Sequence, residues 1–529
     1  MNAPAPAAET AAPAPSPLRI QRLSLTDFRA FPGPAPAEFN LDGKNLLVYG
    51  ENGSGKSSIF HALNGFFSLK PARTLLNQKN VFSAQPDTTC KVEVIFTNDD
   101  KPIEWNSSKH PCATDLSRPA SGWYHFFFRG ADARVLLTAL RGSFLDYRSL
   151  LDTNYKHGGN KINLFDIAVE RLLSDFPVPV AGGTSRTIGE LWQAVEQAKP
   201  EKHTKTALAK VNQACADFNN GFNQALAELH PLVGALLGDL IGADVTIAPF
   251  VFGGITYAVA HYKRDRVIAG RSLTLNVSYR TRALATPQNF LNEARLSALA
   301  LAIYLAGRLA CTPTATADAL KLLVLDDVLI GLDHSNRLPV LDVLDSRFSD
   351  WQTVLLTHDR NWFDLARSHL PEGGWKCVEI YEGDSAATAP MPIVRPVQNR
   401  PALALLEKAK ELIKTSYVEA AANYARQSFE LGVRSACELK GINMPYRVYP
   451  KTSKPPLQAQ DFLNRLKTWR VTGGVKQADW DVAIKRLEEL KNVVMNPYSH
   501  PDAPNIPKQE VERAIDAVEK FLEMAGKKP

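Results

Sequence analysis

The sequence has few cysteines and no long uninterrupted run of apolar residues. Its six cysteines, among 529 residues, are Cys90, Cys112, Cys215, Cys311, Cys377 and Cys437. No two of them form a C-x-x-C pair, which argues against a zinc site and predicts a chain that is kept in a reducing cytoplasm. No apolar stretch approaches the length of a membrane span, so no membrane contact is predicted.

The first residues, 1–17, lack both the basic start and the apolar core of a signal peptide, and consist almost entirely of Ala and Pro. This composition predicts a disordered tail. The remaining chain is long enough for two to four domains. Its 45% apolar and 22% charged residues are typical of a soluble globular protein.

Net charge is only +6, and most of this excess lies near the C-terminus. From residue 401 onward there are 21 of the 61 Lys and Arg residues but 16 of the 55 Asp and Glu residues, a local excess of five. A contact with DNA or RNA is one interpretation. A solvated helical surface is the other, and so mild an excess favours it slightly.

The most specific pattern is a glycine-rich loop at 50–57, which fits G-x-x-x-x-G-K-[ST] at every fixed position. An apolar run at 45–49 predicts a buried strand before it, and 58–63 predicts the start of a helix after it. Strand, loop and helix together predict a nucleoside triphosphate site, whereas an accidental glycine turn before a helix is the alternative. The predicted binding residues are Gly50, Asn52, Gly53, Ser54, Gly55, Lys56, Ser57 and Ser58. In this pattern Lys56 reaches the β- and γ-phosphates and the Ser57 hydroxyl ligates Mg²⁺.

A second carboxylate-bearing segment lies at 322–327, where four apolar residues precede Asp326 and Asp327. This Walker B arrangement predicts that Asp326 holds Mg²⁺ through water and that Asp327 acts as the general base. Ordinary strand ends produce the same short pattern. The order of the parts favours the functional interpretation, because a loop at 331–333 comes next and another buried strand, 351–358, ends in His358.

Together, the segments 28–31, 50–57, 326–327, 331–333 and 357–359 resemble the ABC-type ATPases of the SMC and RecF kind. The resemblance covers residues 18–381. It implies Asp327 in the place of the usual catalytic glutamate, Asp333 as the D-loop carboxylate, His358 as the sensor of the γ-phosphate, and Arg29 near the nucleotide. ATP and Mg²⁺ are the implied substrate and metal.

In this family a signature segment, often L-S-x-G-E, caps the γ-phosphate of the other subunit from a helix N-terminus. It falls on 291–295 here, where Asn292 replaces Ser and can still cap a helix. Two of the other positions also depart from the pattern, which predicts slow hydrolysis. No Q-loop glutamine is found in the expected region, 126–132. A site divided in this way implies a homodimer or a higher even oligomer.

The resulting fold class is α/β, a P-loop ATPase head with a short helical insert, followed by an all-α C-terminal bundle. An insert of about ninety residues broken by Pro and Gly is too short for the coiled coil of an SMC protein. The predicted organisation is a tail (1–17), the N-terminal half of the head (18–149), the insert (150–242), the C-terminal half of the head (243–382), a linker (383–399) and a helical domain (400–529).

The C-terminal segments 417–438 and 491–500 resemble HEPN-type domains, which in many defence and toxin proteins cut RNA. Asn496 and His500 match the usual Arg-x4–6-His motif, but its Arg position falls on Met495, which cannot stabilise a charged phosphate. An interaction module is therefore favoured over an active ribonuclease.

Three hypotheses arise from these patterns. The first is a dimeric ATPase that serves as a sensor or regulator in a bacterial anti-phage or DNA-repair system, by analogy with similar ATPases. The second is a nucleotide-gated scaffold that holds a separate nuclease or other effector protein. The third is an ATP-controlled ribonuclease.

Overall fold

The computed structural model divides the chain into two compact units, an α/β unit (Met1–Pro396) and a C-terminal unit (Val397–Pro529). The residues that it describes are 17–68, 75, 77–107, 109, 111, 132–141, 143–154, 162–179, 185–260, 262, 265–311, 320–371, 373–383, 390–397, 401–415, 417–444, 457–471, 475–495 and 507–526. Residues 126–131 of the region where a Q-loop glutamine is expected, and Asn496 and His500, lie outside these residues.

A six-stranded sheet forms the centre of the α/β unit, in the order β19-β18-β3-β17-β16-β6. Its strands are β19 (Ile393–Val397), β18 (Trp375–Tyr381), β3 (Asn45–Gly50), β17 (Gln352–Thr357), β16 (Leu322–Asp326) and β6 (Ser143–Asp146). The strands from β18 to β6 are parallel. All residues of β16 and β17 are buried, as the apolar runs of their sequences predict for a sheet covered on both faces.

A second, antiparallel sheet has the order β2-β1-β4-β5. Its strands are β2 (Ala37–Asn40), β1 (Ile20–Thr26), β4 (Lys91–Phe96) and β5 (Asp99–Asn106). One hydrophobic cluster joins this sheet, the helix α1 (Lys56–Phe66) and the central sheet, with Leu25, Ile59 and Val48 among its buried members. Because α1 begins at Lys56, this packing fixes the position of the glycine loop.

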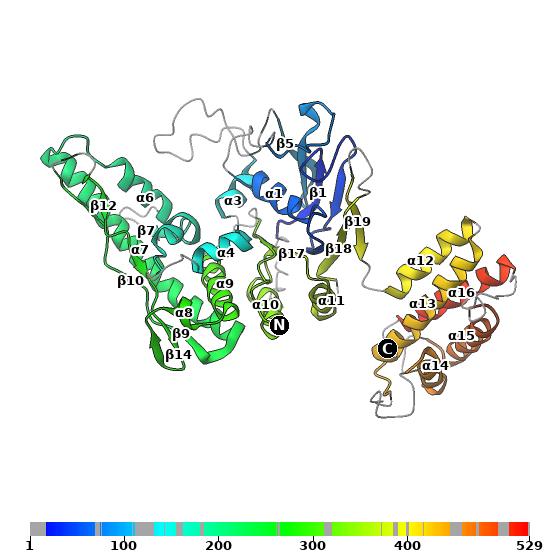
Figure 1. Ribbon diagram of the computed structural model, residues 1–529. Coiled ribbons are helices and arrows are strands. Elements are labelled where there is room, and N and C mark those ends of the chain that lie inside the picture. The colour runs from blue at the N-terminus through cyan, green and yellow to red at the C-terminus, as the bar shows by residue number, and fades with distance from the viewer. Residues whose placement is uncertain are drawn as a thin grey trace, which may run out of the picture. The chain divides into compact units, whose positions relative to one another are not determined.

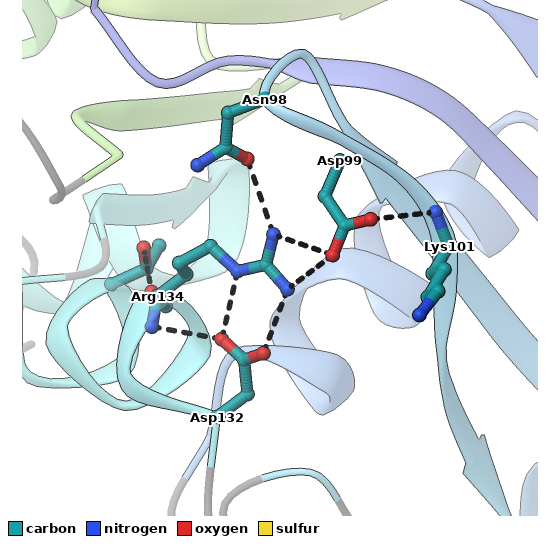
Figure 2. Close-up of polar contacts among 6 residues, drawn as sticks. Asn98, Asp99, Lys101, Asp132 and Arg134 are labelled. Atoms are coloured by element: carbon teal, nitrogen blue, oxygen red, sulfur yellow. Dashed lines mark hydrogen bonds and ion pairs between the residues drawn. The ribbon is translucent and has the colours of Figure 1, made fainter.

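Ion pairs fasten the helix α3 (Ala133–Arg141) to the hairpin that joins β4 and β5 (Figure 2). Arg134 Nη2 lies 2.8 Å from Asp132 Oδ2 and 3.4 Å from Asp99 Oδ2, and its Nη1 donates to Asn98 Oδ1 at 3.1 Å. The Arg134 guanidinium also lies over the ring of Phe96. This contact holds the start of the chain segment that leads into β6.

A lobe with helices and small sheets comes after β6. Its elements are α4 (Tyr147–Asn154), α5 (Phe165–Ile167), η3 (Ala168–Leu172), β7 (Pro177–Pro179), β8 (Ser185–Thr187), α6 (Ile188–Gln197), α7 (Lys205–Ile241), η4 (Gly242–Asp244), β9 (Val245–Ile247), β10 (Val251–Phe252), β11 (Thr256–Tyr257), β12 (Ile268–Ala269), β13 (Leu273–Thr274), β14 (Val277–Tyr279) and β15 (Arg282–Leu284). Figure 1 shows the lobe in cyan and green. Both β9 and β11 contact α7, so the lobe continues past residue 242, the boundary predicted for the insert. The sequence of such short strands does not indicate which part of the fold they pack against. For this reason the predicted boundary lies too early.

The helix α7 contains charged and polar residues, so the prediction that no uninterrupted apolar stretch approaches a membrane span is not contradicted. By length and composition alone, residues Lys205–Asp244 meet the criterion for a helix that could cross a membrane. The core helix of a globular protein meets it as well, and α7 buries Phe218, Phe222 and Leu236. Phe218 and Phe222 stack at 5.3 Å between ring centroids within an aromatic cluster of the lobe.

The described part of the α/β unit has four further helices: α8 (Pro287–Phe290), α9 (Glu293–Ala310), α10 (His334–Arg347) and α11 (Arg360–His369). A short turn, η2 (Asp87–Thr89), precedes β4. Nearly every residue of α9 is buried, because α7 and α4 both pack on it. Leu291, in an extended conformation, separates α8 from α9, and Asn292 is the N-cap of α9.

All elements described in the C-terminal unit after β19 are helical: α12 (Pro401–Lys414), α13 (Val418–Leu439), α14 (Ala459–Thr468), α15 (Gln477–Leu490), η6 (Lys491–Met495) and α16 (Lys508–Ala525). Phe429, Trp480 and Phe521 lie in their shared core. The predicted linker 383–399 is wrong in part, because β19 within it is an edge strand of the central sheet. Its prolines indicate a linker by composition, but proline is tolerated on edge strands.

Candidate functional site

The carboxyl ends of four neighbouring parallel strands meet at one edge of the central sheet. Asp326 of β16 pairs with Leu356 of β17 on one side and with Asp146 of β6 on the other. Thr357, the last residue of β17, pairs with Tyr49 of β3. The glycine loop after β3, the carboxylates after β16 and His358 after β17 therefore lie at the same edge, where ligands of such sheets bind.

The glycine loop has a backbone that other residues would not tolerate. Gly53 and Gly55 have φ angles of 91° and 95°, in the left-handed region that favours glycine. At Gly50, a Cβ would lie 2.4 Å from Ser54 Oγ, and at Gly55 it would lie 2.8 Å from Ala30 Cβ. The sequence places glycine at these positions because the loop has to turn sharply and pack closely.

The first turn of α1 is arranged to receive an anion. Gly55 precedes α1 without a side-chain cap, and no acidic residue lies in the first turn, so the first N–H groups keep their capacity to bind a phosphate. Ser54 is fully buried and its Oγ has no hydrogen-bond partner among the described residues. Asn52 and Gly53 are exposed, whereas Ser58 is buried and its Oγ accepts a hydrogen bond from Ala30 N at 3.4 Å.

Lys56 and Asp327 form an ion pair across the site. The Lys56 side chain is only 4% exposed, so this pair is the contact that neutralises a buried cation. The other oxygen of Asp327, Oδ1, accepts a hydrogen bond from the backbone N–H of His358 and lies 3.0 Å from His358 Nδ1. Both oxygens of the Asp327 carboxylate are thus occupied.

Asp327 has a left-handed backbone with φ 54°, which is uncommon for a residue with a side chain. Its own N–H donates to Leu356 O at 3.1 Å and holds this conformation. A cavity of about 50 Å³ adjoins Asp327 and His358 and is also lined by Arg337 and Trp362. A cavity of that size has room for a water molecule beside the carboxylate.

Asp326 is buried, and one of its carboxylate oxygens has no hydrogen-bond partner among the described residues. The side chain is 8% exposed, and this oxygen is Oδ1. Burial raises the pKa of this carboxyl, while Lys56 and a hydrogen bond with Ser57 lower it and the neighbouring Asp327 and Asp146 raise it further. A buried carboxylate beside a serine hydroxyl is a donor set that fits Mg²⁺, which takes few protein ligands and keeps waters and phosphate oxygens. Among the described residues, no group of three or more His, Cys, Asp or Glu side chains is arranged to hold a metal ion.

We expect Asp326→Asn to stabilise the chain by about 1 kcal/mol at neutral pH, because it removes the charge from a buried carboxyl whose Oδ1 has no hydrogen-bond partner among the described residues. Since the pKa is raised in the folded state, the folded chain binds the proton more tightly, and ionisation of Asp326 lowers stability as pH rises above the usual Asp range. Urea unfolding at pH 4 and pH 7 measures this. The free energy of unfolding of the variant should exceed that of the wild type at pH 7, and by a smaller margin at pH 4. Equal or lower stability at pH 7 would show that the carboxylate is satisfied.

Two residues that sequence patterns did not identify also lie at this edge. Asp146 is the register partner of Asp326, and it caps α4 by accepting a hydrogen bond from Ser149 N at 2.9 Å. His61 lies on α1, where burial and Arg29 lower its pKa and Asp146 raises it. The four-residue strand β6 is too short for a recognisable period, and α1 shows His61 only as one helical residue, so neither had a sequence signal.

Arg29 lies in a tight turn that packs against the glycine loop. Its φ is 49°, and its Nη1 donates to Gln78 Oε1 at 2.5 Å. Asn80 Nδ2 donates to the carbonyl of Arg29 at 2.6 Å, which holds the turn. Burial lowers the pKa of the Arg29 guanidinium.

The signature and D-loop residues are placed differently. Asn292 accepts a hydrogen bond from Arg295 N at 3.1 Å and so caps α9, while the exposed Asp333 precedes α10 without a side-chain cap. The two segments are packed together, because a Cβ on Gly331 would lie 2.3 Å from Ser297 Oγ of α9. The structure thus brings Lys56, Ser57, Asp326, Asp327 and His358 together, whereas the hydrogen bond of Asn292 is made within its own helix.

Comparison with known proteins gives one family match. The model of the RecF/RecN/SMC N terminal domain matches residues 19–371. The solved Smc head domain of Pyrococcus furiosus, bound to the C-terminal domain of ScpA, is 13% identical with a TM-score of 0.40, covering 74% of this chain and 100% of that one. The SMC head domain of Thermotoga maritima is 15% identical with a TM-score of 0.32, covering 72% and 99%. No curated protein sequence matches significantly.

Proposed function

The chain belongs to the RecF/RecN/SMC N-terminal domain family, and on this premise we propose that it binds ATP with Mg²⁺ at the edge of the central sheet and hydrolyses it. The observation that carries the proposal is the convergence of three strand ends. Lys56 after β3, Asp326 and Asp327 at the end of β16, and His358 after β17 lie in mutual contact or in register. Residue types and order are those that phosphoryl transfer to water requires.

Each residue has a role that its chemistry supports. The backbone N–H groups of the glycine loop and Lys56 Nζ bind the β- and γ-phosphates. Ser57 and Asp326 hold Mg²⁺, which when bound neutralises developing charge on the phosphate oxygens. Arg29 contributes a cation near the nucleotide, and Ser58 supports the turn that carries it.

The proton of the attacking water goes to Asp327. As the water oxygen bonds to the γ-phosphorus, the bond from phosphorus to the β–γ bridging oxygen breaks, and the carboxylate accepts the proton. His358 holds Asp327 Oδ1 through its ring and its backbone N–H, so Oδ2 is the oxygen left for water once Lys56 turns to the phosphates. Base activation and phosphate binding are therefore linked through Lys56.

The finer organisation is also part of the proposal. The ATPase head consists of an N-terminal half, 18–149, and a C-terminal half that follows the inserted lobe, and its sites form between two copies. Asn292 and the N-terminus of α9 from one subunit, with Asp333, face the γ-phosphate bound by the other. The C-terminal unit is an all-α, HEPN-like interaction module that engages a nuclease or another effector, with DNA or RNA as a further partner.

In the cell, the chain serves in the cytoplasm as a sensor or regulator of anti-phage defence or DNA repair. A nucleotide-gated scaffold that holds its effector without rapid turnover is the alternative, and the departures in the signature segment support it. Steady-state phosphate release with and without DNA separates the two. Stimulated turnover favours the regulated ATPase, and binding without turnover favours the scaffold. RNA cleavage that is lost on His500→Ala would establish a ribonuclease instead.

A mixing experiment tests the divided site. Asn292→Arg puts a bulky cation at the junction while leaving each phosphate loop intact, so we expect nucleotide binding to persist and hydrolysis to be lost. Asn292→Ser keeps a helix cap and serves as the matched control, with turnover retained. Mixed with Lys56→Ala subunits, Asn292→Arg should regain activity, because about half of randomly paired dimers contain one complete site. If the mixture stays inactive while the subunits exchange, the site is not divided in this way.

A further inference from the structure

The connection between the two units is part of the central sheet. β19 is its edge strand beside β18 (Figure 1), and it ends at Val397, where the C-terminal unit begins. The helix α12 starts at Pro401, so only residues 398–400 separate the sheet from the helices. Three residues reach at most about 14 Å from Val397 to Pro401, so the start of α12 stays within that distance of the end of β19.

The start of β19 lies against the phosphate loop. Pro392, immediately before the strand, is buried, and a Cβ on Gly55 would lie 3.3 Å from its Cγ. The neighbouring strand touches the same loop, because Ile380 of β18 pairs with Gly50 and its carbonyl oxygen lies 3.2 Å from the position of a Gly50 Cβ. The strand β18 and the residue that precedes β19 therefore both lie against the phosphate loop.

A second chain of contacts runs from the His358 segment to β19. Arg360, two residues after His358, lies with Cζ 5.1 Å from the ring centroid of Tyr49, the residue before the loop. Its Nη1 donates to Tyr381 Oη at 3.2 Å, and the Arg395 guanidinium lies 5.4 Å from the Tyr381 ring centroid. Arg395 belongs to β19, so Tyr381 and Arg360 link this strand to the His358 segment, while Pro392 links it to the phosphate loop.

We propose that β19 is the output element of the ATPase, through which nucleotide state controls the C-terminal unit. This inference depends on the proposed nucleotide site. When Lys56 leaves Asp327 for a phosphate, the loop around Gly55 changes its contact with Pro392, and the Arg360 segment changes its contact with Tyr381. β19 is an edge strand and is hydrogen-bonded to one sheet neighbour, so fewer hydrogen bonds oppose its displacement than oppose that of an inner strand. A ligand shifts an equilibrium between two conformations only if it binds them with different affinity. Here the contacts of Gly55 with Pro392 and of Arg360 with Tyr381 would differ between the two conformations.

Energy transfer between two dyes tests the proposal in the full chain. One label is placed at Asp100→Cys in the exposed β4–β5 hairpin and one at Val482→Cys, which is 69% exposed on α15, in a Cys112→Ser background. The five other cysteines are buried. ATPγS with Mg²⁺ should change the transfer efficiency, and ATPγS affinity is measured on the same samples.

Two substitutions interrupt the proposed route, and a third is the matched control. Pro392→Ala removes the ring that meets Gly55, Arg395→Ala removes the contact with Tyr381, and Pro396→Ala changes an exposed proline of the same strand. The nucleotide-induced change should fall by at least half in each of the first two variants and vanish in the double variant. It should persist in Pro396→Ala, with ATPγS affinity within about twofold throughout.

The outcomes are distinguishable. A full change in the double variant, or no change in the wild type despite ATPγS binding, overturns the output role of β19 alone. Absence of ATPγS binding in the wild type overturns the proposed nucleotide site itself. If the double variant loses nucleotide binding, the single variant Arg395→Ala tests the output role of β19. The exposed Arg395 side chain contacts Tyr381 and not the phosphate loop, so its removal should leave nucleotide binding intact.

Discussion

Replacing Asp327 by asparagine should slow ATP hydrolysis at least about 100-fold, because an amide cannot accept the proton of the attacking water. The same change should tighten nucleotide binding. Without the carboxylate, the buried Lys56 has no ion-pair partner, and a bound phosphate group can take the place of that partner. We expect an affinity gain for ATPγS of roughly tenfold, which corresponds to about 1.4 kcal/mol.

Phosphate release and ATPγS titration measure the two effects separately. Asp350→Asn is the matched control, because Asp350 pairs with Lys321 at the opposite end of β16, far along the strand from the site. That variant should resemble the wild type in both assays. Unchanged turnover in Asp327→Asn would remove Asp327 as the base, and unchanged affinity would show that the Lys56 pair does not compete with nucleotide.

Lys56→Ala should abolish triphosphate binding, with a loss of at least about 100-fold, since Lys56 is the cation that the loop aims at the β- and γ-phosphates. The variant also leaves the Asp327 carboxylate without its cation, which adds repulsion toward the incoming phosphates. Lys321→Ala, which removes a lysine from the ion pair at the other end of β16, is the matched control.

Equilibrium titration with a fluorescent ATP analogue provides the readout, and circular dichroism establishes that both variants are folded. We expect Lys321→Ala to bind as the wild type does. Wild-type affinity in a folded Lys56→Ala protein would mean that the triphosphate binds elsewhere, and the glycine loop would lose its assigned role.

The parts of the site that could be predicted from sequence are those carried by strand ends. The buried runs of β3, β16 and β17 are clear from composition, and parallel strands place the residues after their carboxyl ends at a common edge. The sequence alone therefore points to Lys56, Asp327 and His358, although their order along the chain says nothing of the contacts that the structure reveals between them.

The parts that could not be predicted depend on pairing between distant segments. The place of β6 beside β16, and with it Asp146 beside Asp326, is set by tertiary packing of a strand only four residues long. β19 contains Pro396 and lies in a stretch whose composition indicates a linker. Its role in the sheet is decided by its neighbour β18, because an edge strand needs hydrogen bonds on one side only.

The extent of the lobe cannot be predicted for a related reason. Segments such as β9 and β11 are two or three residues long, and their alternation fits any half-buried surface. Contact with α7 assigns them to the lobe, and no local pattern encodes that contact.

A crystal structure of the Asp327→Asn chain with Mg²⁺ and ATP is the most direct test of the account. We predict the γ-phosphate within hydrogen-bonding distance of Lys56 Nζ, the metal between Ser57 Oγ and Asp326, and the side chain at position 327 freed from Lys56 but still held by His358. ATP bound away from the glycine loop, or Lys56 still bonded to residue 327 beside an occupied site, would contradict it.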